Sequence, residues 1–447
     1  MTNLTMFMSD NTNEYPISNV AKNEWLDFAM YTVEARAIPN MIDGLKPVQR
    51  FYLYSSILNS KRDFKKVSAV SGIISDFGYN HGEASAAGAG QLMAATWNNN
   101  LCLVEGRGSF GTRLIQEAGA PRYVYTKLSS NFDKYIKDTD LSPQHEDPEH
   151  EPPAFYVPII PLVLVNGTKG IATGFATHIL PRDPQDLIVA CSEYVKTGNI
   201  KTEPQIKFPE FKGMVKKELE ENKYQVLGCF EKKGKTTLVI YEVPYGFDRE
   251  SYVKILDKLE DDGDIVGYED LCDKEGFKFE IKLKQVTSAK WNNKQIMTKF
   301  KLSRPLSENL TVIDYNGKLR EYKDAKKLIA DFCDYRLTIL QKRIEKKILE
   351  NEEEVRWLDV KLKFIEAVRN GEIDIMNLPK TELIKQIVKI TGCSANETSK
   401  LMAMPISSIM KSEPATFKKF ITEAKKKLKF WKTTTSTDQF IEDLNTL

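Results

Sequence analysis

Residues 105–126 of this 447-residue chain are EGRGSFGTRLIQEAGAPRYVYT, a glycine-rich turn that runs on to an Arg-Tyr pair. Gly106, Gly108 and Gly111 leave the backbone free to come close to a partner or to adopt a positive φ. Arg122 stands directly before Tyr123, which places a permanent cation beside a hydroxyl nucleophile. This pairing suits a protein that attacks a phosphodiester.

The same stretch resembles the active-site region of type IIA DNA topoisomerases. The breakage-reunion subunits of that family carry G-x-G-x-F-G and then R-Y-x-x-T. The resemblance implies that Tyr123, and not Tyr125, is the catalytic nucleophile, with Arg122 as the cation beside it. The R-Y-x-Y-T spelling found here is nearer to the eukaryotic topoisomerase II version than to the bacterial gyrase A version.

The composition is that of an ordinary soluble globular protein, with 41% hydrophobic and 28% charged residues. The length suffices for roughly two to four domains. No apolar run reaches the ~18 residues of a membrane helix, and the N-terminus lacks a signal-peptide layout, so we expect a cytoplasmic protein without a membrane partner. The six cysteines are scattered and form no C-x-x-C pair, which argues against a zinc site and a disulfide framework.

The charge is unevenly distributed along the chain. The formal net charge is only +2, which by itself does not indicate a nucleic-acid-binding protein. Between Lys46 and Lys66, however, six basic residues face a single acidic one, Asp63. A locally basic face on a nearly neutral protein is typical of DNA binding on one side only.

Residues 36–50, RAIPNMIDGLKPVQR, combine turn formers with basic residues. An amphipathic pattern before them predicts a helix that stops ahead of Pro39, and Pro47 is a good first residue for the next helix. The intervening turns would present Arg36, Lys46 and Arg50 at one end of a helix, where backbone N–H groups and cations hold phosphates together.

These three side chains could also be solvated surface charges, which is the most common situation of lysine and arginine. The stretch nevertheless resembles the opening signature of the topoisomerase family, R-A-I-P-x-x-x-D-G-L-K-P-V-x-R. The resemblance implies that Arg36, Lys46 and Arg50 grip the cleaved duplex. Phe51 stands where gyrase has a second arginine, which removes one expected phosphate contact.

Residues 78–83, GYNHGE, contain an isolated histidine, His81. An isolated histidine is more often a structural hydrogen-bonding residue than a catalyst. The surroundings resemble a family block whose last histidine hydrogen-bonds the reacting phosphate, which implies that role for His81, although Asn80 departs from the eukaryotic pattern. Ala84 replaces the serine with which gyrase holds quinolones, so weak quinolone sensitivity is expected.

A loose polar arm over residues 1–20 is expected to precede a mostly helical DNA-binding domain of winged-helix type over residues 21–140. The next stretch, residues 142–153, is acidic and rich in proline. His145 and His150 could hold a metal there, but their spacing suits no common site, and we predict a solvated loop.

Residues 156–174, YVPIIPLVLVNGTKGIATG, predict a buried strand followed by an N-G-T-K-G turn. Ile171 lies just beyond that turn and could simply belong to the core. The segment resembles the family pattern P-x-L-V-N-G-x-x-G-I-A/G-x-G, which implies that Ile171 wedges between base pairs and bends the duplex. The unstacking that an apolar wedge causes costs a few kcal/mol, offset by the contacts of the bent DNA.

From about residue 183 to residue 323 the pattern alternates strands and helices. The resemblance implies that residues 141–323 form the α/β tower domain that buttresses the DNA arms. Residues 224–230 and 236–243 predict a hairpin. Residues 249–259 predict a helix, and the strict alternation over residues 277–284 predicts a half-buried strand.

The last third, residues 324–447, is predicted to be helical. Residues 324–369 contain neither proline nor glycine. Residues at alternating spacings of four and three predict a coiled-coil seam: Ile344, Ile348, Asn351, Val355, Leu358, Leu362 and Ile365. Asn351 would set the register of the seam, and residues 416–431 predict a returning helix. Residues 401–409 resemble the dimer gate of topoisomerase II.

The predicted fold is therefore multidomain α+β: a winged-helix DNA-binding domain, an α/β tower domain, and a long antiparallel coiled coil that ends in a helical dimer gate. The resemblance implies that Tyr123 forms a transient 5′-phosphotyrosyl bond in double-stranded DNA within a homodimer. No metal site is expected on this chain, and it lacks the G-x-x-x-x-G-K-[ST] motif. Mg²⁺ and ATP are accordingly expected on a partner, the large subunit with the ATPase and TOPRIM domains.

Three other classes of protein remain open at the level of sequence. The chain could be a catalytically silent DNA-binding scaffold. It could be a tyrosine recombinase, although that class joins protein to the 3′ end and needs an R-H-x-x-R constellation that is missing here. It could also be a coiled-coil dimerisation protein alone.

Overall fold

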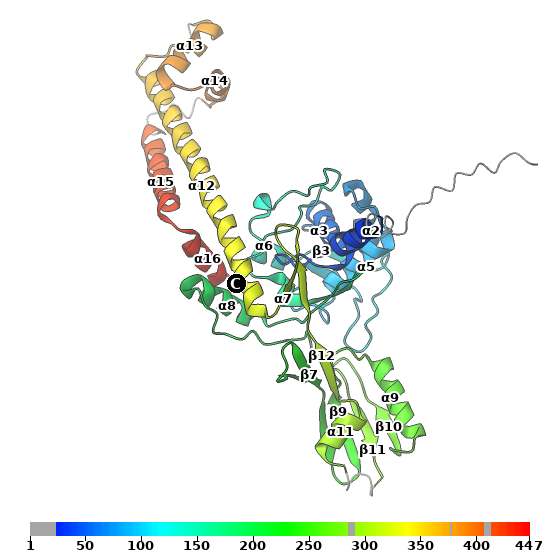
Figure 1. Cartoon of the computed structure of the whole chain (residues 1–447). Helices are drawn as coiled ribbons and strands as arrows, with labels where there is room; N and C mark the ends of the chain where they lie inside the picture. The colour runs from blue at the N-terminus through cyan, green and yellow to red at the C-terminus, as the bar shows by residue number, and fades with distance from the viewer. Residues whose placement is uncertain (1–23, 285–290, 376–377, 406–412) are drawn as a thin grey trace, which may run out of the picture. The chain divides into compact units, whose positions relative to one another are not determined.

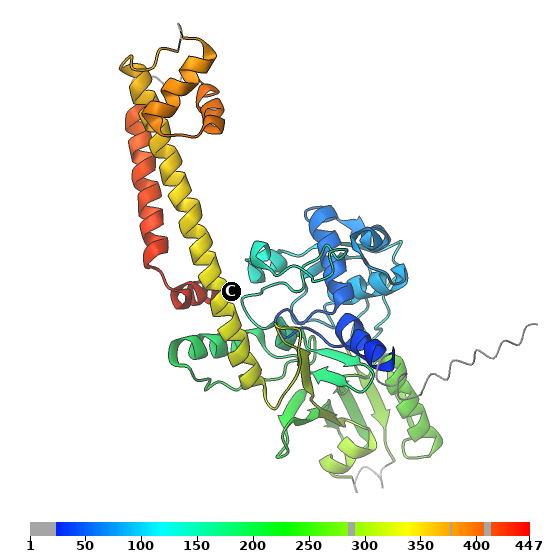
Figure 2. The same cartoon turned by 45° about the horizontal axis from the view of Figure 1, so that its top comes forward.

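The computed structural model describes residues 24–284, 291–375, 378–405 and 413–447 (Figures 1 and 2). The predicted polar arm, residues 1–20, lies outside the described residues. The chain forms two compact units. The first extends to Tyr335 and includes Leu444–Leu447, and the second is Arg336–Asp443. Each unit has its own hydrophobic core.

The first unit begins with helices around a small antiparallel sheet. The helical segment α2 (Glu24–Thr32) and η1 (Val33–Ala37) ends before Pro39, and α3 (Pro47–Asn59) begins at Pro47, as predicted. Proline suits the first turn because its missing N–H would have no partner there. The other elements of this part are η2 (Ile74–Phe77), α4 (Val67–Gly72), α5 (Glu83–Ala94) and the sheet of β1 (Lys65–Lys66), β3 (Tyr125–Leu128) and β2 (Val104–Arg107), in that spatial order.

A short helix and a two-stranded hairpin follow. The apolar run predicted as a buried strand instead contains the helix α7 (Leu162–Asn166), because an apolar run does not by itself distinguish a buried helix from a buried strand. Gly167, with φ 65°, ends this helix. The predicted turn is also displaced, since β4 (Thr168–Ile171) occupies most of it and pairs with β5 (Ala176–Ile179). Further helices of this region are α6 (Ser130–Tyr135), η3 (Thr139–Leu141) and α8 (Pro184–Thr197).

The remainder of the first unit is built mainly from sheets, and the two larger ones lie at the bottom of Figure 1 in green and yellow-green. A four-stranded sheet has the order β10 (Gly267–Asp270), β11 (Phe279–Lys282), β9 (Thr237–Glu242), β8 (Cys229–Lys233). A three-stranded sheet has the order β12 (Ser303–Ser307), β7 (Lys223–Leu227), β6 (Met214–Lys217). The other elements are the pair β13 (Leu310–Ile313) and β14 (Leu319–Tyr322) and the helices α9 (Arg249–Asp261) and α11 (Asn293–Lys299).

Two of the predictions for this region are confirmed and one is wrong. α9 and β11 lie where the sequence pattern predicts a helix and a strand. The predicted hairpin has the wrong first strand, because β8 and not β7 pairs with β9. Gly228 separates β7 from β8, and its N–H donates to the carbonyl of Leu302 at 2.8 Å. A Cβ at this glycine would lie 2.4 Å from the carbonyl oxygen of Glu242, so the break requires glycine.

The second unit contains most of the 45-residue helix α12 (Ala325–Arg369), which begins one residue after the predicted start. α15 (Glu413–Thr433) runs antiparallel to it, since Lys418 pairs with Glu366 at 3.1 Å and Lys432 pairs with Glu352 at 2.6 Å. The remaining helices are α13 (Lys380–Thr391), α14 (Ala395–Met402) and α16 (Ser436–Asn445).

The predicted seam of α12 lies on its covered side, because all seven residues are buried or half-buried. The amide of Asn351 donates to the carbonyl of Lys347 in the same helix at 2.7 Å, so this contact does not itself set a register between helices. The segment that resembles a dimer gate lies partly outside the described residues, since residues 406–412 are not described.

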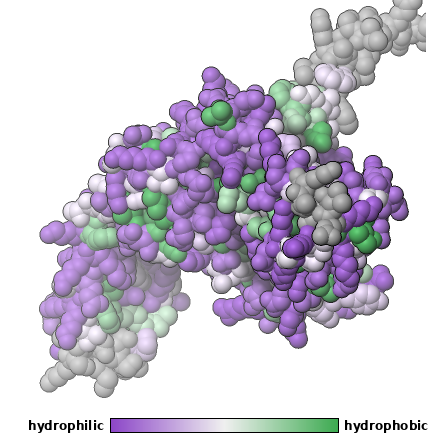
Figure 3. All heavy atoms as spheres, turned by 90° about the horizontal axis from the view of Figure 1, so that it is seen from below, coloured by the Kyte–Doolittle hydropathy of each residue, from purple (hydrophilic) through white to green (hydrophobic). Residues whose placement is uncertain are grey.

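The surface in the view of Figure 3 is mostly hydrophilic, with small separate hydrophobic patches. Within the described part of the chain, no helix combines the length and the apolar character needed to span a bilayer.

Candidate nucleic-acid interface

Tyr123 is presented to solvent by a firmly bonded backbone. Its side chain is 68% exposed, whereas the next residue, Val124, is buried. The carbonyl of Val124 accepts the N–H of Val67 at 3.0 Å, and the carbonyl of Pro121 accepts the N–H of Ser68 at 3.2 Å. These bonds attach both sides of Tyr123 to the start of α4. The phenol is therefore accessible while its backbone is held in place.

The glycines of the motif shape the loop before Tyr123. Gly108 and Gly111 have φ values of 116° and 81°, which favour glycine. A Cβ at Gly106 would lie 2.6 Å from the ring of Phe110. The indole N–H of Trp97 donates to the carbonyl of Phe110 at 2.9 Å. The space that a side chain at position 106 would occupy is thus filled by the Phe110 ring. Close approach of a partner is not needed to explain why this residue is glycine.

Cationic side chains lie close to Tyr123 and to its neighbour Tyr125. The guanidinium carbon of Arg122 lies 4.8 Å from the centre of the Tyr123 ring. Arg107 on β2 and Lys66 on β1 are both exposed and both lie opposite Tyr125 on β3. Lys66 belongs to the basic run noted in the sequence, but Arg107 was not identified there as a site residue. The pairing of β2 with β3 brings Arg107 opposite Tyr125. In the sequence, only its position between Gly106 and Gly108 indicates that Arg107 could belong to the site.

Beneath this surface, Thr126 of the R-Y-x-Y-T stretch is fully buried. Its hydroxyl oxygen lies 2.6 Å from that of Tyr52 on α3. Burial raises the pKa of Tyr52 to about 12, so this hydroxyl remains protonated. A Cβ at Gly90 would lie 2.2 Å from the Tyr52 ring, which means that α5 packs directly on that ring. The sheet carrying Tyr123 is in this way fixed to α3 and α5.

The β4–β5 hairpin exposes the predicted wedge. Ile171 is 78% exposed at the end of β4, opposite Ala176. The preceding residue, Gly170, packs against η1, because a Cβ there would lie 2.0 Å from the carbonyl oxygen of Ala37. Exposure of a large apolar side chain on a supported hairpin is consistent with a contact surface for a ligand.

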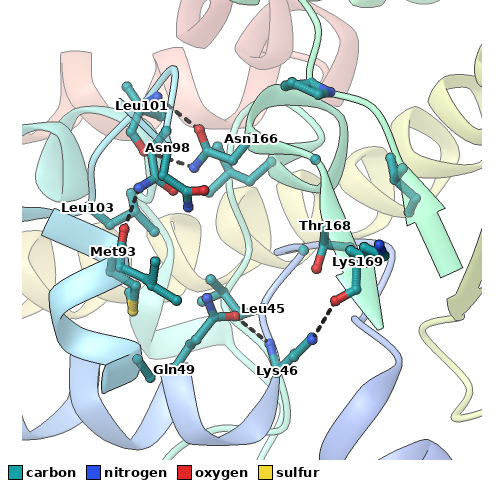
Figure 4. Close-up of a pocket in the computed structure, with 18 of the residues that line it drawn as sticks. Leu45, Lys46, Gln49, Met93, Asn98, Leu101, Leu103, Asn166, Thr168 and Lys169 are labelled. Atoms are coloured by element: carbon teal, nitrogen blue, oxygen red, sulfur yellow. Dashed lines mark hydrogen bonds between the residues drawn. The ribbon is translucent and has the colours of Figure 1, made fainter. Parts of the chain in front are cut away.

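Lys46 braces this hairpin. Its ammonium group donates to the carbonyl of Lys169 at 2.8 Å, as the close-up in Figure 4 shows. Burial lowers the pKa of Lys46. The two lysines border a cavity of about 660 Å³ between α3, α5, α7 and the hairpin. The amide of Asn166 closes another side of it, exchanging hydrogen bonds of 2.8 and 2.9 Å with the backbone of Leu101.

Arg50 lies inside the protein. Its guanidinium donates to both carboxylate oxygens of Asp43, at 2.8 and 3.1 Å, and to the carbonyl of Leu45 at 2.7 Å. Asp43 also accepts the N–H of Tyr156 at 3.0 Å. Burial raises the pKa of Tyr156, and the Asp43 carboxylate adds to the effect. This placement leaves the predicted phosphate contact of Arg50 without support and gives it a role in holding the 43–46 loop.

His81 and Arg36 are both exposed. The Nε2 atom of His81 lies 2.7 Å from the hydroxyl of Tyr31 on α2. Arg36 belongs to η1, the element that packs on the hairpin. The structure thus brings Arg36, Lys46 and Ile171 together around one hairpin. Among the described residues, no hydrogen bond, ion pair or ring contact joins Tyr123 to His81.

The residues that the structure describes do not provide a metal site. They contain no group of three histidine, cysteine or acidic side chains close enough to share an ion. His145 Nε2 and His150 Nδ1 lie 3.3 Å apart and contact each other. Glu105, the acid at the start of the central motif, pairs with Lys127 at 3.1 Å. The described surroundings of Tyr123 therefore do not fit Mg²⁺ coordination by this chain.

Residues 36–446 match the A-subunit family of DNA gyrase/topoisomerase IV, and the chain belongs to this family. The resemblance noted in the sequence is thereby confirmed. The chain is 42% identical over 443 residues to the DNA topoisomerase medium subunit of Enterobacteria phage T4, covering 97% of this chain and 98% of that protein.

Longer proteins match this chain over part of their length. DNA topoisomerase 2 of Arabidopsis thaliana is 30% identical over 83% of this chain, which spans only 26% of that protein. The DNA-binding, cleavage and re-ligation domain of Plasmodium falciparum topoisomerase II matches with a TM-score of 0.86 and 26% identity, over 96% of this chain and 63% of that one. The mixed helix and strand fold is thus that of the DNA-cleaving part of type II topoisomerases, a family of isomerases that uses Mg²⁺ and ATP.

Proposed function

We propose that this chain is the DNA cleavage–religation subunit of an ATP-dependent type II DNA topoisomerase acting in the cytoplasm. The observation that carries the proposal is the placement of Tyr123, whose exposed phenol stands on a fixed backbone beside Arg122. Two further cations, Arg107 and Lys66, lie opposite Tyr125, two residues along the chain. The phenol oxygen of Tyr123 bonds to a DNA phosphorus while the bond from that phosphorus to the neighbouring 3′ oxygen breaks. The phenol loses its proton, and the 3′ oxygen gains one. The product is a 5′-phosphotyrosyl ester.

Arg122 beside Tyr123, with Arg107 and Lys66 opposite Tyr125, assists this step electrostatically in the proposal. Negative charge on the non-bridging phosphate oxygens attracts Arg122, Arg107 and Lys66, and preorganised cations stabilise charge that develops in the transition state. His81 donates a further hydrogen bond to the phosphate in this proposal. Because one phosphodiester replaces another, the 3′ hydroxyl can reseal the strand without ATP.

The hairpin supplies the grip on the duplex. Ile171 is the most exposed large apolar residue of the hairpin, and it inserts between base pairs and bends the DNA. Arg36 contacts phosphates directly. Lys46 contributes positive potential while bracing the hairpin, and Arg50 supports the loop between them. These assignments follow from exposure in the case of Arg36 and from hydrogen bonding in the case of Lys46 and Arg50.

The larger architecture follows from the same function. We propose a winged-helix domain over residues 21–140, a tower over residues 141–323, and an antiparallel coiled coil with a dimer gate over residues 324–447. Cutting both strands requires two tyrosines, hence a homodimer with C₂ symmetry. A second duplex then passes through the paired breaks. The antiparallel pair α12 and α15 supports the coiled-coil assignment.

Mg²⁺ and ATP are assigned to a partner chain, the large subunit with TOPRIM and ATPase domains. The support for this assignment is that the described residues around Tyr123 do not form a carboxylate cluster. The phage relative is itself called a medium subunit, which fits a complex of several chains.

The proposal is tested by trapping protein on DNA with detergent, in the presence of the large subunit, Mg²⁺ and DNA labelled at either end. Wild type is expected to attach covalently to 5′ ends, and Tyr123→Phe is expected to abolish attachment. Tyr125→Phe is the matched control, because Tyr125 is also exposed and only two residues away. Attachment to 3′ ends would indicate a recombinase, and no attachment would indicate a silent scaffold.

A further inference from the structure

One helical segment contacts both the hairpin and the predicted phosphate-binding histidine. Val33 and Ala37 of η1 are buried, and Ala172 at the hairpin tip packs against the cluster they form. The hydroxyls of Thr32 and Thr173 lie 3.4 Å apart. One residue earlier, Tyr31 reaches His81. The segment α2–η1 therefore spans the distance between Ile171 and His81.

The backbone of this segment has an unusual local form. η1 is π-helical, with the N–H of Ile38 donating to the carbonyl of Val33, five residues earlier, at 3.1 Å. Such turns occur frequently at functional sites.

The contact between Tyr31 and His81 uses one ring nitrogen only. Nε2 of His81 is 2.7 Å from the Tyr31 hydroxyl, and the ring stands edge-on to that of Tyr79 at 5.3 Å between centroids. Nδ1 has no hydrogen-bond partner among the described residues. A neutral imidazole has one N–H donor and one bare acceptor nitrogen. If Tyr31 donates to Nε2, the proton of the imidazole is on Nδ1, which is free to donate.

We propose that Tyr31 is a positioning residue for DNA cleavage, which acts through His81. Its hydroxyl donates to Nε2, keeps the proton of His81 on Nδ1, and aims that donor at the reacting phosphate. Because the same segment packs on the hairpin, the orientation of the His81 ring is coupled to the position of Ile171 on the DNA. This proposal rests on the proposed cleavage function.

The simplest alternative is a surface contact without function, since a hydrogen bond between exposed side chains adds little to stability. A double-mutant cycle separates the two cases. Tyr31→Phe removes only the hydroxyl and is expected to lower the yield of covalent complex about three- to tenfold, the equivalent of one hydrogen bond. In a His81→Ala background the same substitution is expected to have no further effect. Equal losses in both backgrounds would overturn the proposal.

Two controls distinguish a specific effect on His81 from a general effect of losing an exposed hydroxyl or of disturbing α2. Tyr241→Phe removes another exposed hydroxyl, bonded to Glu231 at 3.1 Å in the four-stranded sheet, and is expected to leave cleavage unchanged. DNA bending, measured by energy transfer between labels on the duplex ends, is expected to be normal in Tyr31→Phe. Loss of bending would mean that the substitution disturbs α2 packing, and it would overturn a role through His81.

A spectroscopic measurement separates this proposal from the cleavage function. The chain has four histidines, so ring nitrogen-15 signals of selectively labelled protein are few enough to assign. His81 is expected to carry its proton on Nδ1 in wild type and to shift toward the Nε2 tautomer in Tyr31→Phe. An unchanged tautomer overturns the positioning role even if Tyr123 cleaves DNA. A changed tautomer in a protein that forms no adduct refutes the cleavage function instead.

Discussion

The ammonium group of Lys46 donates a hydrogen bond of 2.8 Å to the backbone carbonyl of Lys169. The contact joins the residue that immediately precedes α3 to β4, two residues before the exposed Ile171. Lys46 is half-buried, and burial lowers the pKa of its ammonium group. A basic residue expected to grip DNA is thus also the brace of the hairpin that we propose bends it.

Replacing Lys46 by methionine keeps the length of the side chain but removes the donor. We expect Lys46→Met to lower the DNA bend and to weaken binding roughly ten- to a hundredfold, the value of one charge-assisted hydrogen bond. Energy transfer and fluorescence anisotropy measure the two effects. Lys46→Arg, which can still donate, should recover most of the bend. Full bending by Lys46→Met would show that the hairpin does not need this brace.

The buried pair of Arg50 and Asp43 predicts a stability effect. Removing one partner leaves the other charge buried, so Arg50→Met is expected to reduce the free energy of unfolding by about 3–5 kcal/mol. Urea unfolding provides the measurement. Arg36→Met is the matched control, because Arg36 is exposed, and it should leave stability nearly unchanged. A stable Arg50→Met protein with a reduced salt dependence of DNA binding would restore Arg50 as a phosphate contact.

Ile171 should matter for DNA and hardly at all for folding. Because its side chain is 78% exposed, Ile171→Ala is expected to change the free energy of unfolding by no more than about 0.5 kcal/mol. The same substitution should abolish most of the bend. Ile115→Ala removes another isoleucine, 62% exposed, and should bend DNA normally. A normal bend in Ile171→Ala would exclude the wedge.

Ala84 and Ser85 are neighbouring exposed residues of α5. The sequence resemblance places Ala84 where gyrase uses serine to hold quinolones. Wild-type protein should therefore form little quinolone-trapped cleavage complex, and Ala84→Ser should increase the amount. Trapping is quantified from linearised plasmid. Strong trapping by wild type that is lost in Ser85→Ala would mean that the adjacent hydroxyl takes over the contact.

The cap of α14 should respond to acid. The side chain of Arg356 and the backbone N–H of Ser394 hold the pKa of Glu397 down to about 2, below its ordinary value of 4.5. A lowered folded pKa means that the contribution is complete above pH 4.5 and is lost as the pH falls through about 2. The protection of the α14 amides against hydrogen exchange, relative to the intrinsic rate at each pH, should therefore fall over that window in wild type. In Glu397→Gln this added acid response should be absent.

Much of the secondary structure could be predicted because its signals are local. Pro47 marks the start of α3, the proline-free run from residue 324 marks α12, and alternation marks β11. The predictions failed where local signals were ambiguous. An apolar run became the helix α7, and β8 rather than β7 paired with β9, because Gly228 ends one strand by a close approach to the carbonyl of Glu242.

The candidate site likewise contains some features that the sequence predicts and others that only the tertiary structure shows. The spelling around Arg122 and Tyr123, and the apolar identity of Ile171, are determined by the sequence itself, because neighbours in the chain stay neighbours in space. Tertiary structure alone decided that Arg50 is buried on Asp43, that Arg107 lies opposite Tyr125, and that Tyr31 meets His81, 50 residues away. Contacts of this kind depend on how helices and strands pack, and side-chain chemistry along the chain does not specify which distant partner each group will find.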